Sequence, residues 1–154
     1  MTNDETQLDQ RYFFDDGLRF ECSQCGKCCT GAPGAVRVTE QEILQLAEFF
    51  GISRAAFERD FIRRIETAGA QDNLLRGSIV SLIEREDGSC IFLNDGKCGV
   101  HSLRPAQCRT FPFWTKNLRT EESWQRTGLE CPGIGSGPVW VRDEILRTVG
   151  ESPI

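Results

Sequence analysis

Eight cysteines are the residues of this 154-residue chain whose type and spacing could do chemistry. Four of them form an octet at residues 22–29, Cys22-Ser-Gln-Cys25-Gly-Lys-Cys28-Cys29. Two CxxC steps in series let successive thiolates converge on one metal ion, and Gly26 gives the backbone the freedom that such a turn needs. Adjacent cysteines cannot easily direct both sulfurs into one tetrahedron, so we expect Cys29 to bridge, to serve a second site or to be a spare thiol.

The other four cysteines lie beside glycine-rich turns and in a short predicted helix, at Cys90, Cys98, Cys108 and Cys131. Together with the octet they offer eight soft ligands, enough for one four-cysteine site and a partial one, or for two full sites. Soft ligands favour zinc or an iron–sulfur cluster over magnesium or calcium. We therefore expect all eight cysteines to be metal ligands.

The choice between zinc and an iron–sulfur cluster stays open at this point. A CxxCxxC run with a remote cysteine followed by proline, here Cys131, is the ligand pattern of ferredoxin-type four-iron clusters, which slightly favours iron and sulfur. Zinc sites more commonly use two separated CxxC pairs, and only one half of this chain contains CxxC steps. The cysteines between the octet and Cys131 do not follow the cluster pattern, and a zinc site could use them with Cys131 or His101.

Three charged or titratable residues accompany the second group of cysteines. His101 is the only histidine, and it could be a metal ligand, a proton donor to a bound thiolate or a polar turn residue. Arg104 and Arg109 flank Cys108, and their guanidinium groups would offset the negative charge that four thiolates leave around a metal. The alternative for both arginines is a surface ion pair.

Composition excludes several classes of protein. The net charge is −5 and there is no lysine-rich block, so we expect no nucleic-acid partner. The chain has no apolar run near 18 residues and begins with a polar, acidic segment, so we expect neither a membrane span nor an export signal. These features predict a cytoplasmic protein, and in a reducing compartment closely spaced thiols are metal ligands more often than disulfides.

Two consecutive helices are expected to support the cysteine site. Thr39 and Glu42 can cap one another reciprocally, so the first helix should begin at Glu40 and end near Gly51. Its apolar stripe would contain Ile43, Leu44, Leu46, Ala47 and Phe50. Ser53 can cap the second helix, and the residues on its apolar side would be Ala56, Phe57, Phe61, Ile62 and Ile65.

Short strands, turns and further helices fill the remainder of the chain. A hairpin is expected over 11–20, and strands over 35–38, 78–85, 90–93 and 122–127, with turns at Asp87-Gly88 and Asn94-Asp95-Gly96. Helical segments are expected at 106–108 and 140–149, and a loop at 131–138. The pattern predicts a small α+β fold with a helix pair, short antiparallel strands and a loop-rich cysteine site. We expect a polar tail at residues 1–10 and a single domain at 11–154.

The residues quoted above resemble the YkgJ-type cysteine-cluster family (CxxCxxCC), described as a zinc- or iron-chelating domain. The resemblance runs from about Phe20 to Gly137 and rests on these elements: Cys22-x2-Cys25-x2-Cys28-Cys29, Cys90, Cys98, Arg104-Pro105-x2-Cys108-Arg109-x-Phe-Pro and Cys131-Pro132-Gly133. It implies metal chelation by the octet together with the later cysteines in a small mixed fold, and no defined reaction.

A similar cysteine domain is associated with flagellin lysine methylases, which raises methyl transfer as an alternative. The glycines at 133, 135 and 137 follow a Cys-Pro loop, whereas a nucleotide-type glycine loop should follow a strand. The sequence thus predicts a metal-chelating protein that uses an iron–sulfur cluster or zinc for redox or metal handling, with metal ions and a protein as partners. The alternatives are an accessory or catalytic domain of a methyltransferase-like protein-modifying enzyme, and a structural zinc protein; enzymatic activity of its own is the less expected outcome.

Overall fold

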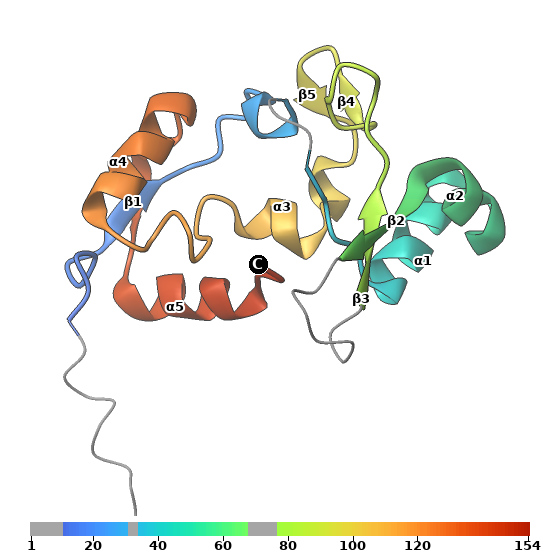
Figure 1. Ribbon diagram of the computed structural model, residues 1–154. Coiled ribbons are helices and arrows are strands. Elements are labelled where there is room, and N and C mark those ends of the chain that lie inside the picture. The colour runs from blue at the N-terminus through green and yellow to red at the C-terminus, as the bar shows by residue number, and fades with distance from the viewer. Residues whose placement is uncertain (1–10, 31–33, 68–76) are drawn as a thin grey trace, which may run out of the picture. The chain divides into compact units, whose positions relative to one another are not determined.

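The computed structural model describes residues 11–30, 34–67 and 77–154 (Figure 1). The polar tail predicted at residues 1–10 lies outside these described residues. Five α-helices and three two-stranded antiparallel sheets form the regular structure of the described part, which confirms the α+β class. In chain order the elements are β1 (Leu18–Phe20), the 3-10 helix η1 (Lys27–Cys29), α1 (Glu40–Phe50), α2 (Arg54–Phe61), β2 (Ile62–Thr67), β3 (Gly77–Leu82), β4 (Leu93–Asn94), β5 (Lys97–Cys98), the 3-10 helix η2 (His101–Leu103), α3 (Ala106–Thr110), α4 (Glu121–Glu130), β6 (Ile134–Trp140) and α5 (Arg142–Glu151).

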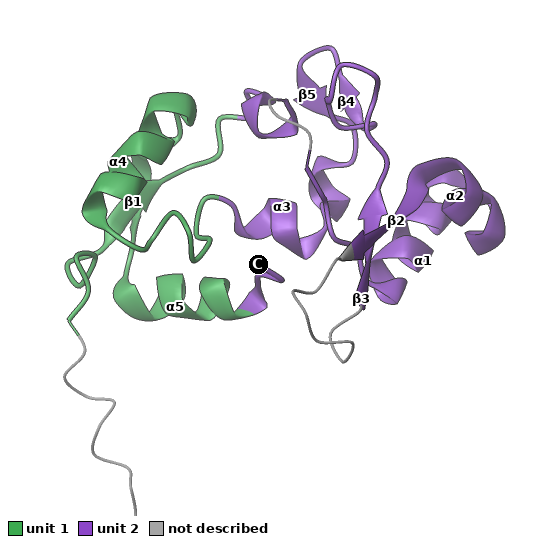
Figure 2. Ribbon diagram, viewed as in Figure 1, with its two compact units in different colours: residues 1–23, 112–150 green, residues 24–111, 151–154 purple. Residues whose placement is uncertain are grey.

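The chain forms two compact units, which Figure 2 shows in different colours. Unit 1 contains residues 1–23 and 112–150, and unit 2 contains residues 24–111 and 151–154. The single domain predicted for residues 11–154 remains a prediction. Within the described residues, every helix is too short or too polar to span a lipid bilayer.

Helix α1 of unit 2 begins and ends where the sequence predicts. The Glu42 amide donates to Thr39 Oγ1 at 3.2 Å, and the Thr39 amide donates to Glu42 Oε2 at 2.8 Å, so the reciprocal cap is present. Gly51 ends the helix in the left-handed region, with φ 66°. Of the predicted stripe, Leu44 and Phe50 remain 50% and 40% exposed, whereas the other three side chains are buried.

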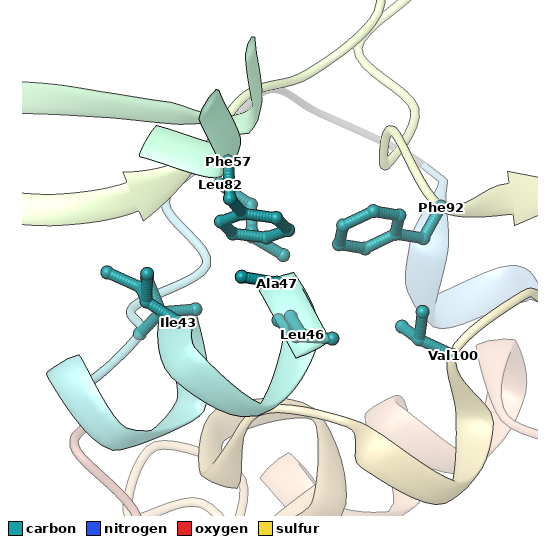
Figure 3. Close-up of a cluster of buried hydrophobic side chains, with 8 residues drawn as sticks. Ile43, Leu46, Ala47, Phe57, Leu82, Phe92 and Val100 are labelled. Atoms are coloured by element: carbon teal, nitrogen blue, oxygen red, sulfur yellow. The ribbon is translucent and has the colours of Figure 1, made fainter. Parts of the chain in front are cut away.

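Buried side chains from α1, α2, β3 and the loop before β4 form the core of unit 2. Figure 3 shows how they converge, with Phe57 and Phe92 facing the helix α1 side chains. The rings of Phe57 and Phe92 stack with centroids 6.4 Å apart. Each buried ring of this size contributes about 1.5–3 kcal/mol to folding. The core members are Val38, Ile43, Leu46, Ala47, Phe57, Leu82, Phe92 and Val100.

The second helix is shorter than the sequence predicts. Helix α2 ends at Phe61, and Ile62 and Ile65 lie in strand β2. In the β2–β3 ladder Ile62 is opposite Leu82, and Ile65 is opposite Ile79. The three-residue spacing of the two isoleucines fits a helix, but all six residues of the strand pair in register with β3, and this long-range interaction decides the outcome.

The hairpin between β4 and β5 confirms the turn predicted at residues 94–96. Asp95 and Gly96 both have positive φ, 49° and 74°, as a two-residue turn between antiparallel strands requires. Leu93 is opposite Cys98 in this hairpin. The return strand predicted over 90–93 reduces to one bridge between Glu84 and Cys90, because the chain turns again at residues 91–92.

Unit 1 is built on the pairing of β1 with β6. Leu18 is opposite Trp140, and Phe20 is opposite Ile134. The hairpin predicted over 11–20 is therefore wrong, because the strand at its end pairs with a distant segment rather than with its own neighbour. The loop predicted over 131–138 is also partly wrong, since β6 begins at Ile134 and its glycines at 135 and 137 accommodate φ of 85° and 78° within the strand.

The strand predicted over residues 122–127 is a helix. In α4 the Ser123 amide donates to the Thr120 hydroxyl at 3.1 Å, and Arg126 pairs with Glu122 one turn away at 2.9 Å. Trp124 packs into the unit 1 core. A capping threonine and a first turn with two glutamates favour the helix, and the strand prediction overlooked both signals. Helix α5 confirms the helix predicted near residues 140–149.

Substitution of the capping residue tests the role of α1 in unit 2. Thr39→Ala removes the hydroxyl that accepts from the Glu42 amide, so the free energy of unfolding should fall by about 1 kcal/mol in a denaturant titration. Gln41→Ala alters an exposed residue of the same helix turn and should leave the stability nearly unchanged. Equal stability of the two variants would contradict this account of the cap.

Candidate metal centre

The octet folds as a tight turn that ends in η1. The Cys29 amide donates to the Gly26 carbonyl at 3.0 Å, and the Thr30 amide donates to the Lys27 carbonyl at 3.1 Å. Gly26 has φ 73° and lies so close to the Gly96 carbonyl that there is no room for a Cβ. Both facts require glycine at this position. The octet therefore packs directly against the β4–β5 hairpin, which carries Cys98.

Backbone hydrogen bonds join the octet to the second group of cysteines. The Cys90 amide donates to the Cys29 carbonyl at 2.8 Å. The Leu93 amide donates to the Cys90 carbonyl at 3.0 Å, and the Gly99 amide donates to the Phe92 carbonyl at 2.8 Å. Because Phe92 is only 7% exposed and belongs to the core, the loop between Cys90 and Cys98 is anchored in the interior of unit 2.

Four thiols of unit 2 form a cluster around one sulfur. The Cys29 side chain hydrogen-bonds to the side chains of Cys28, Cys90 and Cys98. We call these four residues the thiol cluster. The expectation that adjacent Cys28 and Cys29 would not direct their sulfurs into one place is wrong, because the 3-10 turn of η1 brings the two side chains into contact. Cys29, expected to be a bridge or a spare thiol, is the centre of the group.

The thiol cluster has hydrogen-bonded rather than ligand geometry. Across the described ranges 11–30, 34–67 and 77–154, no three or more His, Cys, Asp or Glu side chains are already arranged as the ligands of one ion. The cluster cysteines form no disulfide with one another. Rotation about the side-chain torsions of four neighbouring cysteines is a small change, and soft thiolates are the donors that zinc and iron prefer. The donor set thus fits such a metal.

The hydrogen bonds of Cys29 determine how the cluster ionises. A donated S–H stabilises a neighbouring thiolate, so the pKa values of Cys28 and Cys90 fall to about 7 and that of Cys98 to about 6, against an ordinary 9.0. Burial acts in the opposite direction at all three sulfurs. The pKa of Cys29 itself rises, because its proton is shared with the three neighbours. The thiol cluster as a whole therefore loses its first proton more readily than an ordinary thiol does.

Helix α3 places Cys108 beside the thiol cluster, and the end of η2 places Arg104 there. Burial raises the pKa of Cys108 to about 12, and the negative charges of Cys90, Cys28 and Cys98 act in the same direction. Cys108 is therefore a neutral thiol next to the cluster. The Arg104 guanidinium lowers the pKa values of Cys28 and Cys98, and its Nε donates to the His101 carbonyl at 3.0 Å.

Two side chains fix α3 in unit 2, a role that the sequence analysis assigned to neither of them. The Ala106 amide at the start of α3 donates to Glu42 Oε1 at 2.8 Å, so one carboxylate serves both the α1 cap and α3. Gln107, 7% exposed, accepts from the Arg37 amide at 2.9 Å and donates to the Ala35 carbonyl at 2.7 Å. The position of Gln107 next to Cys108 in the sequence was the signal that could have identified these hydrogen bonds.

The remaining predicted site residues of unit 2 differ in their surroundings. Cys25 and Arg109 are exposed residues. Burial, and to a smaller extent the charge of Arg104, lower the pKa of His101, which favours its neutral imidazole. The roles predicted for these three residues stay predictions.

Cys22 and Cys131 belong to unit 1, where the β1–β6 pairing holds their segments together. The Glu21 amide donates to the Gly133 carbonyl at 3.1 Å, and Gly133 leaves no room for a Cβ beside the Glu21 carbonyl. Gly137 likewise packs against Glu21. These glycines serve strand packing, which agrees with the sequence argument against a nucleotide-binding glycine loop.

The geometry described above defines a small cysteine-rich α+β protein with a thiol site suited to a soft metal. Residues 21–132 match the family model CxxCxxCC, described as a "Putative zinc- or iron-chelating domain", and the chain belongs to this family. Chelation of zinc or iron is thus its function at the level that the family describes. No solved structure matches the chain significantly.

The pKa pattern predicts how metal uptake depends on pH. The pKa values of Cys28, Cys90 and Cys98 fall to about 6 to 7, below the ordinary 9.0, so the thiol cluster as a unit begins to lose protons in this window. Because a metal competes with protons for these sulfurs, uptake from a chelator buffer should weaken as the pH falls through this window. Ultraviolet thiolate absorption of the metal-free protein measures the ionisation directly.

The matched control for this titration is Cys29→Ala, which removes the shared S–H donor. In this variant the pKa values of the three neighbours should move back towards 9.0. A wild-type titration centred near 9.0, or one that Cys29→Ala does not change, would show that the cluster has no such hydrogen bonds.

Proposed function

We propose that this chain binds one zinc or iron ion through the four thiolates of Cys28, Cys29, Cys90 and Cys98. The observation that carries the proposal is the set of hydrogen bonds from Cys29 to the three other sulfurs. These bonds bring cysteines from two separate stretches of sequence to one place. Four thiolates from two such stretches form the usual donor set of a tetrahedral sulfur site.

The close approach of the sulfurs supports a single ion over a cluster. Four sulfurs that each lie about 2.3 Å from one tetrahedral ion are about 3.8 Å apart from one another, a separation that hydrogen-bonded thiols approach. In a four-iron cluster an inorganic core lies between the ligand sulfurs and keeps them farther apart. The ligand pattern slightly favours a four-iron cluster, whereas this proposal favours a single ion.

The surroundings of the thiol cluster also support thiolate ligation. Arg104 places positive charge near Cys28 and Cys98, and charge beside a metal site compensates its thiolates. Cys108 is proposed to remain a protonated neighbour of the site rather than a ligand, because it is buried among negative sulfurs. This differs from the sequence-based expectation that all eight cysteines bind metal.

A four-iron cluster is the second candidate. Its support is the sequence pattern, because Cys22, Cys25, Cys28 and Cys131 follow the ferredoxin-type spacing. The observation that favours it is the hydrogen bond between Glu21 and Gly133, which holds the segments of Cys22 and Cys131 together in unit 1. The two candidates share only Cys28, so single substitutions distinguish them.

Metal handling is the proposed use of the site, in a cytoplasmic setting and with a protein as donor or acceptor. Cys28 is exposed at the edge of the thiol cluster, so an incoming thiol can reach a bound ion by ligand exchange. A purely structural zinc would be expected in a more enclosed site. A redox function is proposed only for the four-iron alternative.

Metal analysis of cysteine variants tests the proposal. Anaerobically purified wild type should contain one zinc or iron per chain, little sulfide and no iron–sulfur absorption near about 400 nm. Cys98→Ser should lose most of the metal and should also lower the thermal unfolding temperature, because metal binding contributes to folding. Cys108→Ser and Cys131→Ser are the matched controls, and both should retain the metal.

Two outcomes would overturn the proposal. Matching amounts of iron and sulfide with loss in Cys131→Ser, but not in Cys98→Ser, would establish the four-iron candidate instead. A wild-type protein without zinc, iron or sulfide that also fails to take up either metal on titration would reject metal binding at this site altogether.

A further inference from the structure

Arg85 holds the backbone on both sides of Cys90. Its amide donates to the Ser89 carbonyl at 2.9 Å, and its Nη2 donates to the Ile91 carbonyl at 3.2 Å. The bridge between Glu84 and Cys90 extends this pairing by one residue. Arg85 therefore contacts both residues that flank one cysteine of the thiol cluster, although it belongs to no cysteine motif.

The turn between Arg85 and Cys90 is closed by its own hydrogen bonds. The Gly88 amide donates to the Arg85 carbonyl at 2.9 Å, and Asp87 Oδ1 accepts from both the amide and the hydroxyl of Ser89, at 2.9 and 2.6 Å. Asp87 lies close enough to Arg85 to feel its charge. Asp87 is thus hydrogen-bonded to Ser89, and the Arg85 guanidinium is hydrogen-bonded to the Ile91 carbonyl beside Cys90.

Charge balance gives the Arg85 guanidinium a second role. Four thiolates around a divalent ion leave a net charge of about −2. Arg104 acts on Cys28 and Cys98, and Arg85 acts on Cys90 from the other stretch of sequence. The two guanidinium groups together would neutralise the filled site.

We propose that Arg85 is a positioning residue of the metal centre, which fixes the backbone on both sides of Cys90 and compensates the charge of its thiolate. The inference rests on the proposed function and deepens it. Arg85 stands two residues before the Asp87-Gly88 turn and lies outside the cysteine pattern.

Three variants separate the charge of Arg85 from its hydrogen bond. Arg85→Gln removes the positive charge, Arg85→Lys keeps it without the guanidinium geometry, and Arg64→Gln removes an equal charge from an exposed position on β2. Zinc affinity is measured by competition with a chromophoric chelator. Arg85→Gln should weaken binding about tenfold or more, the usual effect of removing a group that supports a ligand, whereas Arg85→Lys should recover part of the loss and Arg64→Gln should bind as wild type.

A second readout is independent of metal binding. In metal-free protein the amide hydrogens of residues 89–92, followed by peptide mass analysis, should exchange faster in Arg85→Gln than in wild type, because the hydrogen bond from Arg85 Nη2 to the Ile91 carbonyl is lost. Equal metal affinity and equal amide exchange of wild type and Arg85→Gln would overturn the inference and leave the proposed function intact. Failure of wild type itself to bind metal would instead overturn the proposed function, and the role of Arg85 with it.

Discussion

The hydrogen bond from the Cys90 amide to the Cys29 carbonyl is the constraint on which the site depends. It connects two stretches of chain whose cysteines have no pattern in common, and it does so through the backbone. The side chain of Cys29 contacts Cys90 and Cys98 across this connection. Four soft donors that the fold holds near one another lower the conformational entropy that metal binding must overcome.

The hydrophobic core of unit 2 stabilises this connection. Phe92 lies in the interior while its neighbours in sequence carry the cysteines, so packing energy is used to hold the loop between Cys90 and Cys98. On the other side, Glu42 links the start of α1 to the start of α3, and α3 brings Cys108 to the cluster. Helices α1 and α2, which lie between the two cysteine stretches in sequence, thus act as the scaffold of the site.

Local signals in the sequence were sufficient for elements that depend on local interactions. The cap at Thr39, the turn at Asp95-Gly96 and the metal-binding class of the octet could all be read from neighbouring residues. Elements that depend on distant partners could not. Strand β2 exists because β3 pairs with it, and β1 exists because β6 does. The central place of Cys29 and the contacts of Arg85 likewise follow from a chain crossing that no spacing rule describes.

The hairpin that carries Cys98 has a turn of only two residues, both in the left-handed region. Leu93 is opposite Cys98, so these two side chains lie on the same face of the hairpin. A shift of this pairing by one residue would move the Cys98 sulfur to the opposite face, away from its three companions. The strand register that the short turn sets therefore decides whether the second cysteine stretch reaches the first.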